Sequence, residues 1–176
     1  MKSSLTQDRC RGLLVGAAVG DALGMPFQFL HPALIQDWFP LPPQSYLRAP
    51  TGHLNARLDK GQFTDETQLM ALAAETILEK GDVDPQHLAQ GLLRLYETHA
   101  WISPGRSILS ACRHLRQGIP WYEAGGYRDG SKPLAFIPPL VLRHFPHSEA
   151  IFHHSASLAR LILVEPRVQA GCSCFG

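Results

Sequence analysis

The segment from Thr64 to Gly81 constrains the fold of this chain most, because it predicts a helix that is buried along most of its length. Thr64 is a favourable N-cap residue, and Asp65 and Glu66 follow in the first turn, where carboxylates suit the positive end of the helix dipole. Lys80 and Gly81 end the segment in the manner of a helix C-terminus. The positions between are mostly apolar: Leu69, Met70, Leu72, Ala73, Ala74, Ile77 and Leu78.

The N-terminus of this helix therefore presents one hydroxyl and two adjacent carboxylates from a rigid core. Thr64, Asp65 and Glu66 are oxygen ligands of the kind that hard divalent cations such as Mg²⁺ or Mn²⁺ prefer. The same three residues also suit an ordinary capped helix with acids in its first turn. These residues alone leave both interpretations open.

A second helix is predicted from Thr6 to about Leu23, and glycines recur along it at every fourth position. Glycine costs a helix about 1 kcal/mol relative to alanine. The stripe therefore predicts that another backbone or a ligand approaches this face closely. Its members are Gly12, Gly16, Gly20 and Gly24.

The remaining segments are also helical or irregular. Residues 30–62 contain five prolines and predict a long irregular segment. Helices are expected from Asp84 and Pro85, from Ser103 and Pro104 to Gly118, from Ser148 to Val164, and from Pro166 onward. Because no alternating strand pattern of convincing length is present, the chain is predicted to be a single all-α domain over residues 1–176.

The overall composition excludes several classes of protein. Hydrophobic residues make up 45% of the 176 residues and charged residues 18%, and the formal net charge of +1 gives no electrostatic case for nucleic acid. No apolar run is long enough for a membrane span, and the N-terminus lacks the apolar core of a signal peptide. The four cysteines show neither a disulfide framework nor a zinc spacing, and the histidines from His144 to His154 match no zinc pattern. We expect a cytoplasmic protein with reduced thiols.

Three segments together resemble the ADP-ribosylglycohydrolase family, which includes the dinitrogenase reductase activating glycohydrolase and the J1 crystallins. Gly16–Phe27 is similar to the family's opening G-x-x-x-G-D-A-x-G helix, and Phe63–Leu69 is similar to its T-D-D-T metal motif. Gly130–Pro139 is similar to its glycine loop and following helix. The resemblance extends over nearly the whole chain.

The resemblance implies an orthogonal all-α bundle that cleaves the N- or O-glycosidic bond between ADP-ribose and a protein side chain or small adduct. It further implies two magnesium ions, with Thr64, Asp65 and Glu66 as metal ligands and Asp65 and Glu66 as catalytic residues. Asp21, Gly130 and Ser131 fall at substrate-binding positions. The implied partner is ADP-ribose or an ADP-ribosylated protein.

This sequence departs from the family pattern at several of these positions. Gln28 replaces a catalytic or metal-binding glutamate and cannot carry a charge or a proton at neutral pH. In the glycine loop, Lys132 and Pro133 add bulk and remove a backbone donor. The family's second metal motif, D-x-D-T, is not found in this sequence.

We therefore expect a domain whose C-terminal half is missing and whose magnesium site is incomplete, with weak affinity for divalent ions. The alternative is a non-catalytic ADP-ribose-binding or crystallin-like structural protein on the same fold. An apolar surface left open at residues 148–164 and 168–175 would favour self-association or pairing with a complementary C-terminal fragment.

Overall fold

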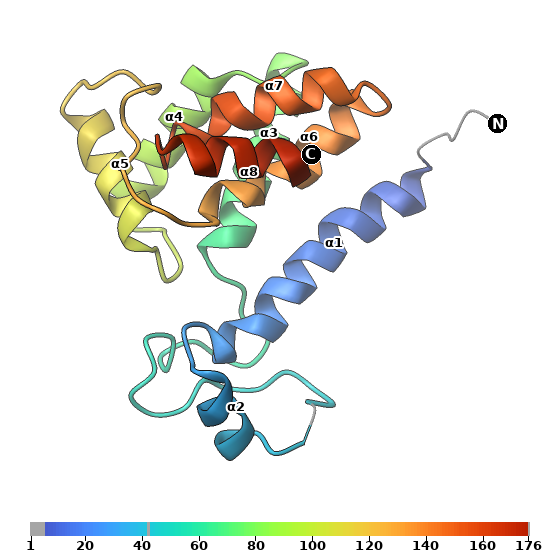
Figure 1. The fold of residues 1–176 in the computed structure, drawn as a ribbon, viewed down its shortest axis with the longest axis vertical. Coiled ribbons are helices and arrows are strands. Elements are labelled where there is room, and N and C mark those ends of the chain that lie inside the picture. The colour runs from blue at the N-terminus through green and yellow to red at the C-terminus, as the bar shows by residue number, and fades with distance from the viewer. Residues whose placement is uncertain (1–5, 42, 176) are drawn as a thin grey trace.

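A computed structural model describes residues 6–41 and 43–175, and in these ranges the chain forms helices and no strand longer than an isolated bridge. Figure 1 shows two parts: a helical body of residues 64–175 and an N-terminal arm of residues 6–63 that extends from it. The elements are α1 (Gln7–Gly24), η1 (Met25–Phe27), α2 (Pro32–Trp38), α3 (Asp65–Lys80), α4 (Pro85–Glu97), α5 (Arg106–Arg116), η2 (Lys132–Phe136), α6 (Ile137–His144), α7 (Ser148–Ala159) and α8 (Pro166–Phe175). The prediction of an all-α fold is confirmed.

Helix α3 is the central element of the body and contacts α1, α4, η2 and α6. Its predicted ends are confirmed: the Thr64 hydroxyl accepts a hydrogen bond from the Glu66 amide at 3.3 Å, and Gly81 closes the helix in the left-handed region at φ 77°. Leu69 and Leu72 are buried in a core shared with Leu88 and Leu92 of α4. The buried core thus fixes the helix whose N-terminus carries the acidic residues.

Helix α5 begins later than the sequence predicted. Ser103 has a positive φ of 50°, and its hydroxyl donates a hydrogen bond to the Asn55 side chain. Gly105 is the N-cap, so the first helical residue is Arg106. The Ser-Pro pair is therefore part of the preceding loop and not the start of the helix.

Helix α7 ends earlier than predicted, at Ala159 instead of Val164. The chain turns away because Gly126 forms a parallel bridge with the segment that follows α7. The Gly126 amide donates to the Ile162 carbonyl at 3.0 Å, and the Val164 amide donates to the Gly126 carbonyl at 3.1 Å. These contacts join residues far apart in the sequence, so local periodicity could not reveal them.

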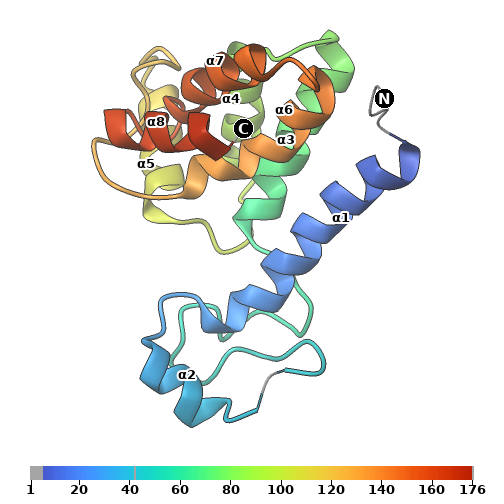
Figure 2. The same cartoon turned by 45° about the vertical axis from the view of Figure 1, so that its right-hand side comes forward.

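The expectation of an open apolar surface at residues 148–164 and 168–175 is wrong for the side chains that the structure describes, although Phe152 is 50% exposed and the side chain of Phe175 lies outside the described part. Leu158, Val168 and Cys172 are buried in the main core, and α7 and α8 lie side by side (Figures 1 and 2). The two helices cover each other's apolar faces. The body therefore encloses its own core over these segments.

In the arm, α1 is a long helix that extends away from the body (Figure 2), and most of its residues are exposed. Ala22 is its only buried residue, and Val15 is 57% exposed. The predicted close approach of another backbone to the glycine stripe is wrong for the described residues, because a Cβ atom added at any of its four glycines would meet nothing within 4 Å. Approach of a ligand to this face stays a prediction. Within the segment predicted to be irregular, His31 and Pro32 start the short helix α2.

Among the described residues, no single helix is long and apolar enough to cross a membrane, although the bent pair Gln7–Phe27 and Pro32–Trp38 together meets those criteria of length and composition.

Candidate functional site

The N-terminus of α3 is fixed to the arm by the carboxylate of Asp21. One oxygen, Oδ2, accepts hydrogen bonds from the Thr64 amide at 2.8 Å, the Thr67 amide at 3.2 Å and the Thr67 hydroxyl at 2.7 Å. The other oxygen accepts the Thr64 hydroxyl at 2.8 Å. Asp21 therefore supplies acceptors for helix-terminal N–H groups that have no partner within α3. These contacts of Asp21 hold this end of the helix in place.

Asp65 is the most deeply buried of the acidic residues at this end, with 1% of its side chain exposed. Its Oδ2 accepts a hydrogen bond from the Gly105 amide at 2.9 Å, and its Oδ1 accepts one from the Lys132 ammonium at 2.8 Å. A buried carboxylate is costly unless it is paired and hydrogen-bonded. Here one backbone donor and one ammonium meet that requirement.

Glu66 also pairs with Lys132, at 2.7 Å between Oε1 and Nζ, but 34% of its side chain remains exposed. Burial is the largest influence on this carboxyl and raises its pKa, while Lys132 acts in the opposite direction. Asp65 and Asp21 contribute further negative charge, and the net result is a raised pKa for Glu66. Such a carboxyl is better suited to carrying a proton than an ordinary surface glutamate.

Lys132 is the cation of this group, and its side chain is only 11% exposed. Burial alone would lower its pKa, but Glu66 and Asp65 outweigh that effect, so the pKa of Lys132 is raised. The lysine is therefore fully charged at neutral pH. It is shared between two carboxylates that are adjacent in the sequence.

A cleft of about 710 Å³ opens in front of Glu66 and Lys132, within the size range of ligand sites. Gln28 lines it, and its side-chain oxygen accepts a hydrogen bond from Asn55 at 2.9 Å. Gly130 and Ser131 also line it, whereas Asp21 does not. The full lining is Gln28, Phe29, Leu54, Glu66, Ser103, Pro104, Gly105, Arg106, Ser107, Arg128, Asp129, Gly130, Ser131 and Lys132.

Asn55 is a residue of this region that the sequence did not single out. It is fully buried, donates to the Met25 carbonyl at 3.2 Å and to Gln28, and accepts the Ser103 hydroxyl. It thereby joins the arm to the loop before α5. A lone asparagine in an irregular segment carries no sequence signal for this role, which depends on contacts with residues 27 and 48 positions away.

The side chains at the N-terminus of α3 do not fit the magnesium site that the resemblance implies. That site would take Thr64, Asp65 and Glu66 as ligands, yet the Thr64 hydroxyl donates to Asp21, and the Lys132 ammonium lies against both carboxylates. Among the described His, Cys, Asp and Glu residues, Asp21, Asp65 and Glu66 do not form a group of mutually close ligand atoms.

A group of mutually close metal-ligand atoms occurs instead at the opposite end of α3. Ligand atoms of Asp82, His144 and His154 lie within 4.8 Å of one another, and the two imidazole rings are stacked. The sequence showed no zinc pattern at these histidines. His144 is largely buried, and burial is the main reason that its pKa is lowered.

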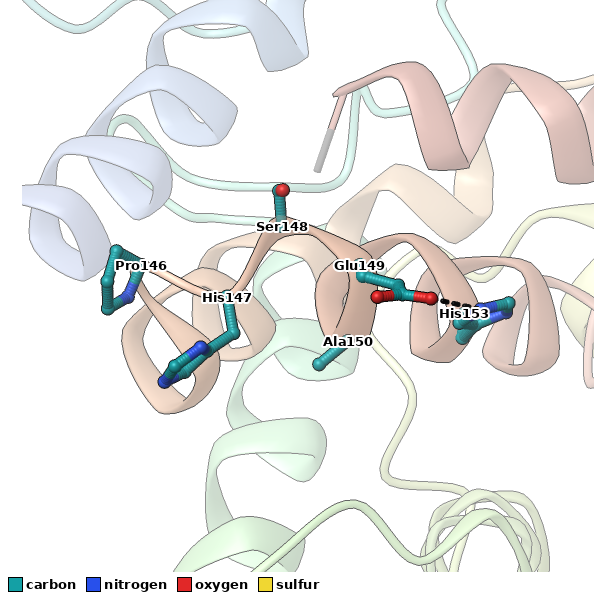
Figure 3. Close-up of a pocket in the computed structure, with 6 residues that line it drawn as sticks. All are labelled: Pro146, His147, Ser148, Glu149, Ala150 and His153. Atoms are coloured by element: carbon teal, nitrogen blue, oxygen red, sulfur yellow. Dashed lines mark ion pairs between the residues drawn. The ribbon is translucent and has the colours of Figure 1, made fainter.

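Another depression, of about 510 Å³, lies at the start of α7 (Figure 3) and shares no residue with the cleft. Its Glu149 and His153 form an ion pair at 3.9 Å, and their side chains are 92% and 70% exposed. Exposed pairs of this kind contribute little, because water screens them. The cleft at Glu66 is therefore the better candidate for a functional site.

Comparison with known proteins agrees with the predicted resemblance. The ADP-ribosylglycohydrolase family model matches residues 2–176. An ADP-ribosylarginine hydrolase Tri1 of Serratia proteamaculans is 29% identical, over 96% of this chain and 46% of its own. The ADP-ribosyl-[dinitrogen reductase] glycohydrolase of Rhodospirillum rubrum is 26% identical, over 96% of this chain and 53% of its own.

A solved structure described as an ADP-ribosylglycohydrolase-related protein complex superposes with a TM-score of 0.73 and 27% identity, over 95% of this chain and 53% of that one. The chain thus spans about half the length of these relatives. The glycohydrolases of this group are metal-dependent. On the family match and the shared fold together, the chain belongs to the ADP-ribosylglycohydrolase family.

Proposed function

We propose that this chain binds an ADP-ribosyl group in the cleft and takes part in hydrolysis of the N- or O-glycosidic bond that joins ADP-ribose to a protein side chain or small adduct. Support comes from the family and from relatives named as hydrolases of ADP-ribosylated arginine and dinitrogen reductase. The observation that carries the proposal is that Glu66 and three cationic side chains line one cleft: Arg106, Arg128 and Lys132.

In this proposal the two arginines recognise the diphosphate. Guanidinium groups bind phosphate oxygens through paired N–H donors, and they remain charged at all physiological pH values. Arg106 is the first residue of α5, while Arg128 belongs to the loop before η2. The two residues approach the cleft from different segments, as a clamp on an extended ligand requires.

Glu66 is the proposed general acid and base. Departure of an arginine or serine side chain from the ribose requires a proton on the leaving atom, and an incoming water must lose one. The raised pKa of Glu66 favours its protonated form, which is the form that can give a proton to the leaving atom. Asp65 cannot easily share this task, because both of its oxygens are engaged by Gly105 and Lys132.

The test compares Glu66→Gln with Glu79→Gln, a change on the same helix outside the cleft. Glutamine cannot transfer a proton, so hydrolysis of ADP-ribosyl-arginine by Glu66→Gln should fall about 100-fold or more. Binding of ADP-ribose, measured by calorimetry, should persist, and Glu79→Gln should match the wild type. If the wild-type chain neither binds ADP-ribose nor hydrolyses the adduct, the proposal is wrong.

A non-catalytic ADP-ribose-binding or structural protein is the second candidate, and one observation favours it. Gln28 stands where the family pattern has a glutamate, and its amide is held by buried Asn55. A polar but uncharged group suits binding more than proton transfer. Calorimetric binding of ADP-ribose without any hydrolysis, in wild type and Glu66→Gln alike, would select this candidate.

A further inference from the structure

The Lys132 ammonium occupies the position between two carboxylates where a divalent ion would otherwise be expected. Its Nζ lies 2.8 Å from Asp65 Oδ1 and 2.7 Å from Glu66 Oε1, both ordinary distances for charged hydrogen bonds. A magnesium ion would need the same oxygens at about 2.0–2.1 Å. The ammonium and the ion would then lie within a few ångströms of each other, with like charges.

The second oxygen of Asp65 and both oxygens of Asp21 are also committed to protein donors. Asp65 Oδ2 accepts the Gly105 amide, and both oxygens of Asp21 accept N–H or O–H groups of α3. The Thr64 hydroxyl donates to Asp21 and accepts from the Glu66 amide. A divalent ion would have to break several of these bonds to collect its ligands, and Mg²⁺ also gives up its own water reluctantly.

The surrounding chain is shaped to hold the lysine in this place. Gly105 faces the side chain, and a Cβ atom there would lie 3.6 Å from Lys132 Cε and 3.8 Å from Asp65 Oδ2. Pro133 follows Lys132 at the start of η2, where its ring fixes the backbone. The lysine is thus buried and enclosed by a loop and a helix N-terminus.

We propose that Lys132 is the resident cation of this site and takes the place of a divalent ion beside Asp65 and Glu66. The chain then assembles the N-terminus of α3 without metal. It also keeps a fixed positive charge at the floor of the cleft, beside the carboxyl of Glu66. This inference concerns the cation alone and does not depend on the proposed reaction.

The test measures Mn²⁺ binding to the 176-residue chain by electron paramagnetic resonance, without any nucleotide. Wild type should show no saturable site below about 1 mM that is lost in Asp65→Asn, since 1 mM is the weak end of the range for carboxylate sites. Lys132→Ala removes the competing charge and should bind Mn²⁺ at least about tenfold more tightly. Lys80→Ala, a change of an exposed lysine at the other end of α3, should behave as wild type.

Each outcome decides the proposal. Micromolar binding by wild type that Asp65→Asn abolishes would overturn it, and so would a Lys132→Ala variant that binds no better than wild type. Lys132→Gln, which keeps an N–H donor without the charge, replaces Lys132→Ala if that variant fails to fold. ADP-ribose binding is measured separately, so failure here is distinct from failure of the proposed function.

Discussion

Helices α1 and α3 are both long and rich in apolar residues, yet they lie in very different surroundings. In α3, Leu69 and Leu72 are buried against neighbouring helices of the body. In α1, Val15 and Leu13 are exposed, as are Val19 and Leu23. Apolar composition therefore does not decide whether a helix is buried. The number of neighbouring elements does, and α1 has the body on one side only.

The connection between the arm and the body also differs from the packing within the body. The body is held by a continuous apolar cluster, whereas the arm meets it through a small apolar contact, between Ile102 and a cluster of the arm, and through polar contacts. Asp21 binds the N-terminus of α3, and Asn55 binds the loop before α5 through Ser103. Such hydrogen bonds are directional and contribute about 0.5–3 kcal/mol each. Directional hydrogen bonds therefore add to a small apolar contact in positioning the arm.

The largest expected difference between the two regions is the cost of truncating an apolar side chain. Leu69→Ala should lower the free energy of unfolding by about 2–5 kcal/mol, because it leaves a cavity in a packed core. Val15→Ala should change it by less than about 0.5 kcal/mol, since the side chain is mostly in water already. Denaturant unfolding of both variants measures the contrast. A large loss for Val15→Ala would show that another surface covers α1.

The next effect concerns Asp21, the main polar link between arm and body. Asp21→Ala should cost about 2–4 kcal/mol, because four donors at the N-terminus of α3 lose a charged acceptor. Asp21→Asn keeps one acceptor and should cost less. Asp37→Asn, an exposed change on α2, serves as the control in the same denaturant measurement. Equal stability of Asp21→Ala and wild type would show that the link contributes nothing.

Features with a local cause could be predicted from the sequence. The cap at Thr64 and the starts of α4 and α8 depend on residues within one turn, and the structure has them where the sequence placed them. The end of α7 could not be predicted, because it depends on pairing with Gly126. Helix α2 was missed because a seven-residue helix is too short to show periodicity.

The candidate site divides in the same way. The clustering of Thr64, Asp65 and Glu66 follows from one capped helix start. The sequence showed Lys132 only as added bulk in a loop, because a long flexible side chain does not reveal where its ammonium will lie. Its contact with Asp65 joins positions 67 residues apart. Partners at such separations are fixed by the packing of η2 against α3, which sequence patterns do not encode.

Replacing a glycine by alanine should change the free energy of unfolding in opposite directions in the body and in the arm. A Cβ at Gly125 would lie 2.4 Å from the Arg160 carbonyl oxygen, so Gly125→Ala should cost about 1–3 kcal/mol through overpacking. A Cβ at Gly16 meets nothing within 4 Å, so Gly16→Ala should stabilise by about 0.5–1 kcal/mol. Thermal unfolding distinguishes the two signs. Destabilisation by Gly16→Ala would restore the close approach that the sequence predicted for the stripe.

The smallest expected effect is chemical and leaves the fold intact. Burial raises the pKa of Cys112 and of Cys172 to about 11, and both side chains lie in the core. Because the thiolate is the reactive form, both should react very slowly with a disulfide reagent at pH 8. Cys174 is exposed and Cys10, on α1, is partly exposed. Two thiols should therefore react quickly, and the other two only after unfolding.

The reaction of Cys10 also tests whether α1 stays uncovered in solution. Its rate in a Cys174→Ser variant reports on the arm alone, because the core thiols remain slow. A rate independent of protein concentration would agree with an exposed α1. A rate that falls as concentration rises would mean that chains associate through this helix, since a covered thiol cannot reach the reagent. In that case, the exposed apolar side chains of α1 would be an interface between copies, and the contrast with α3 would disappear in the assembled protein.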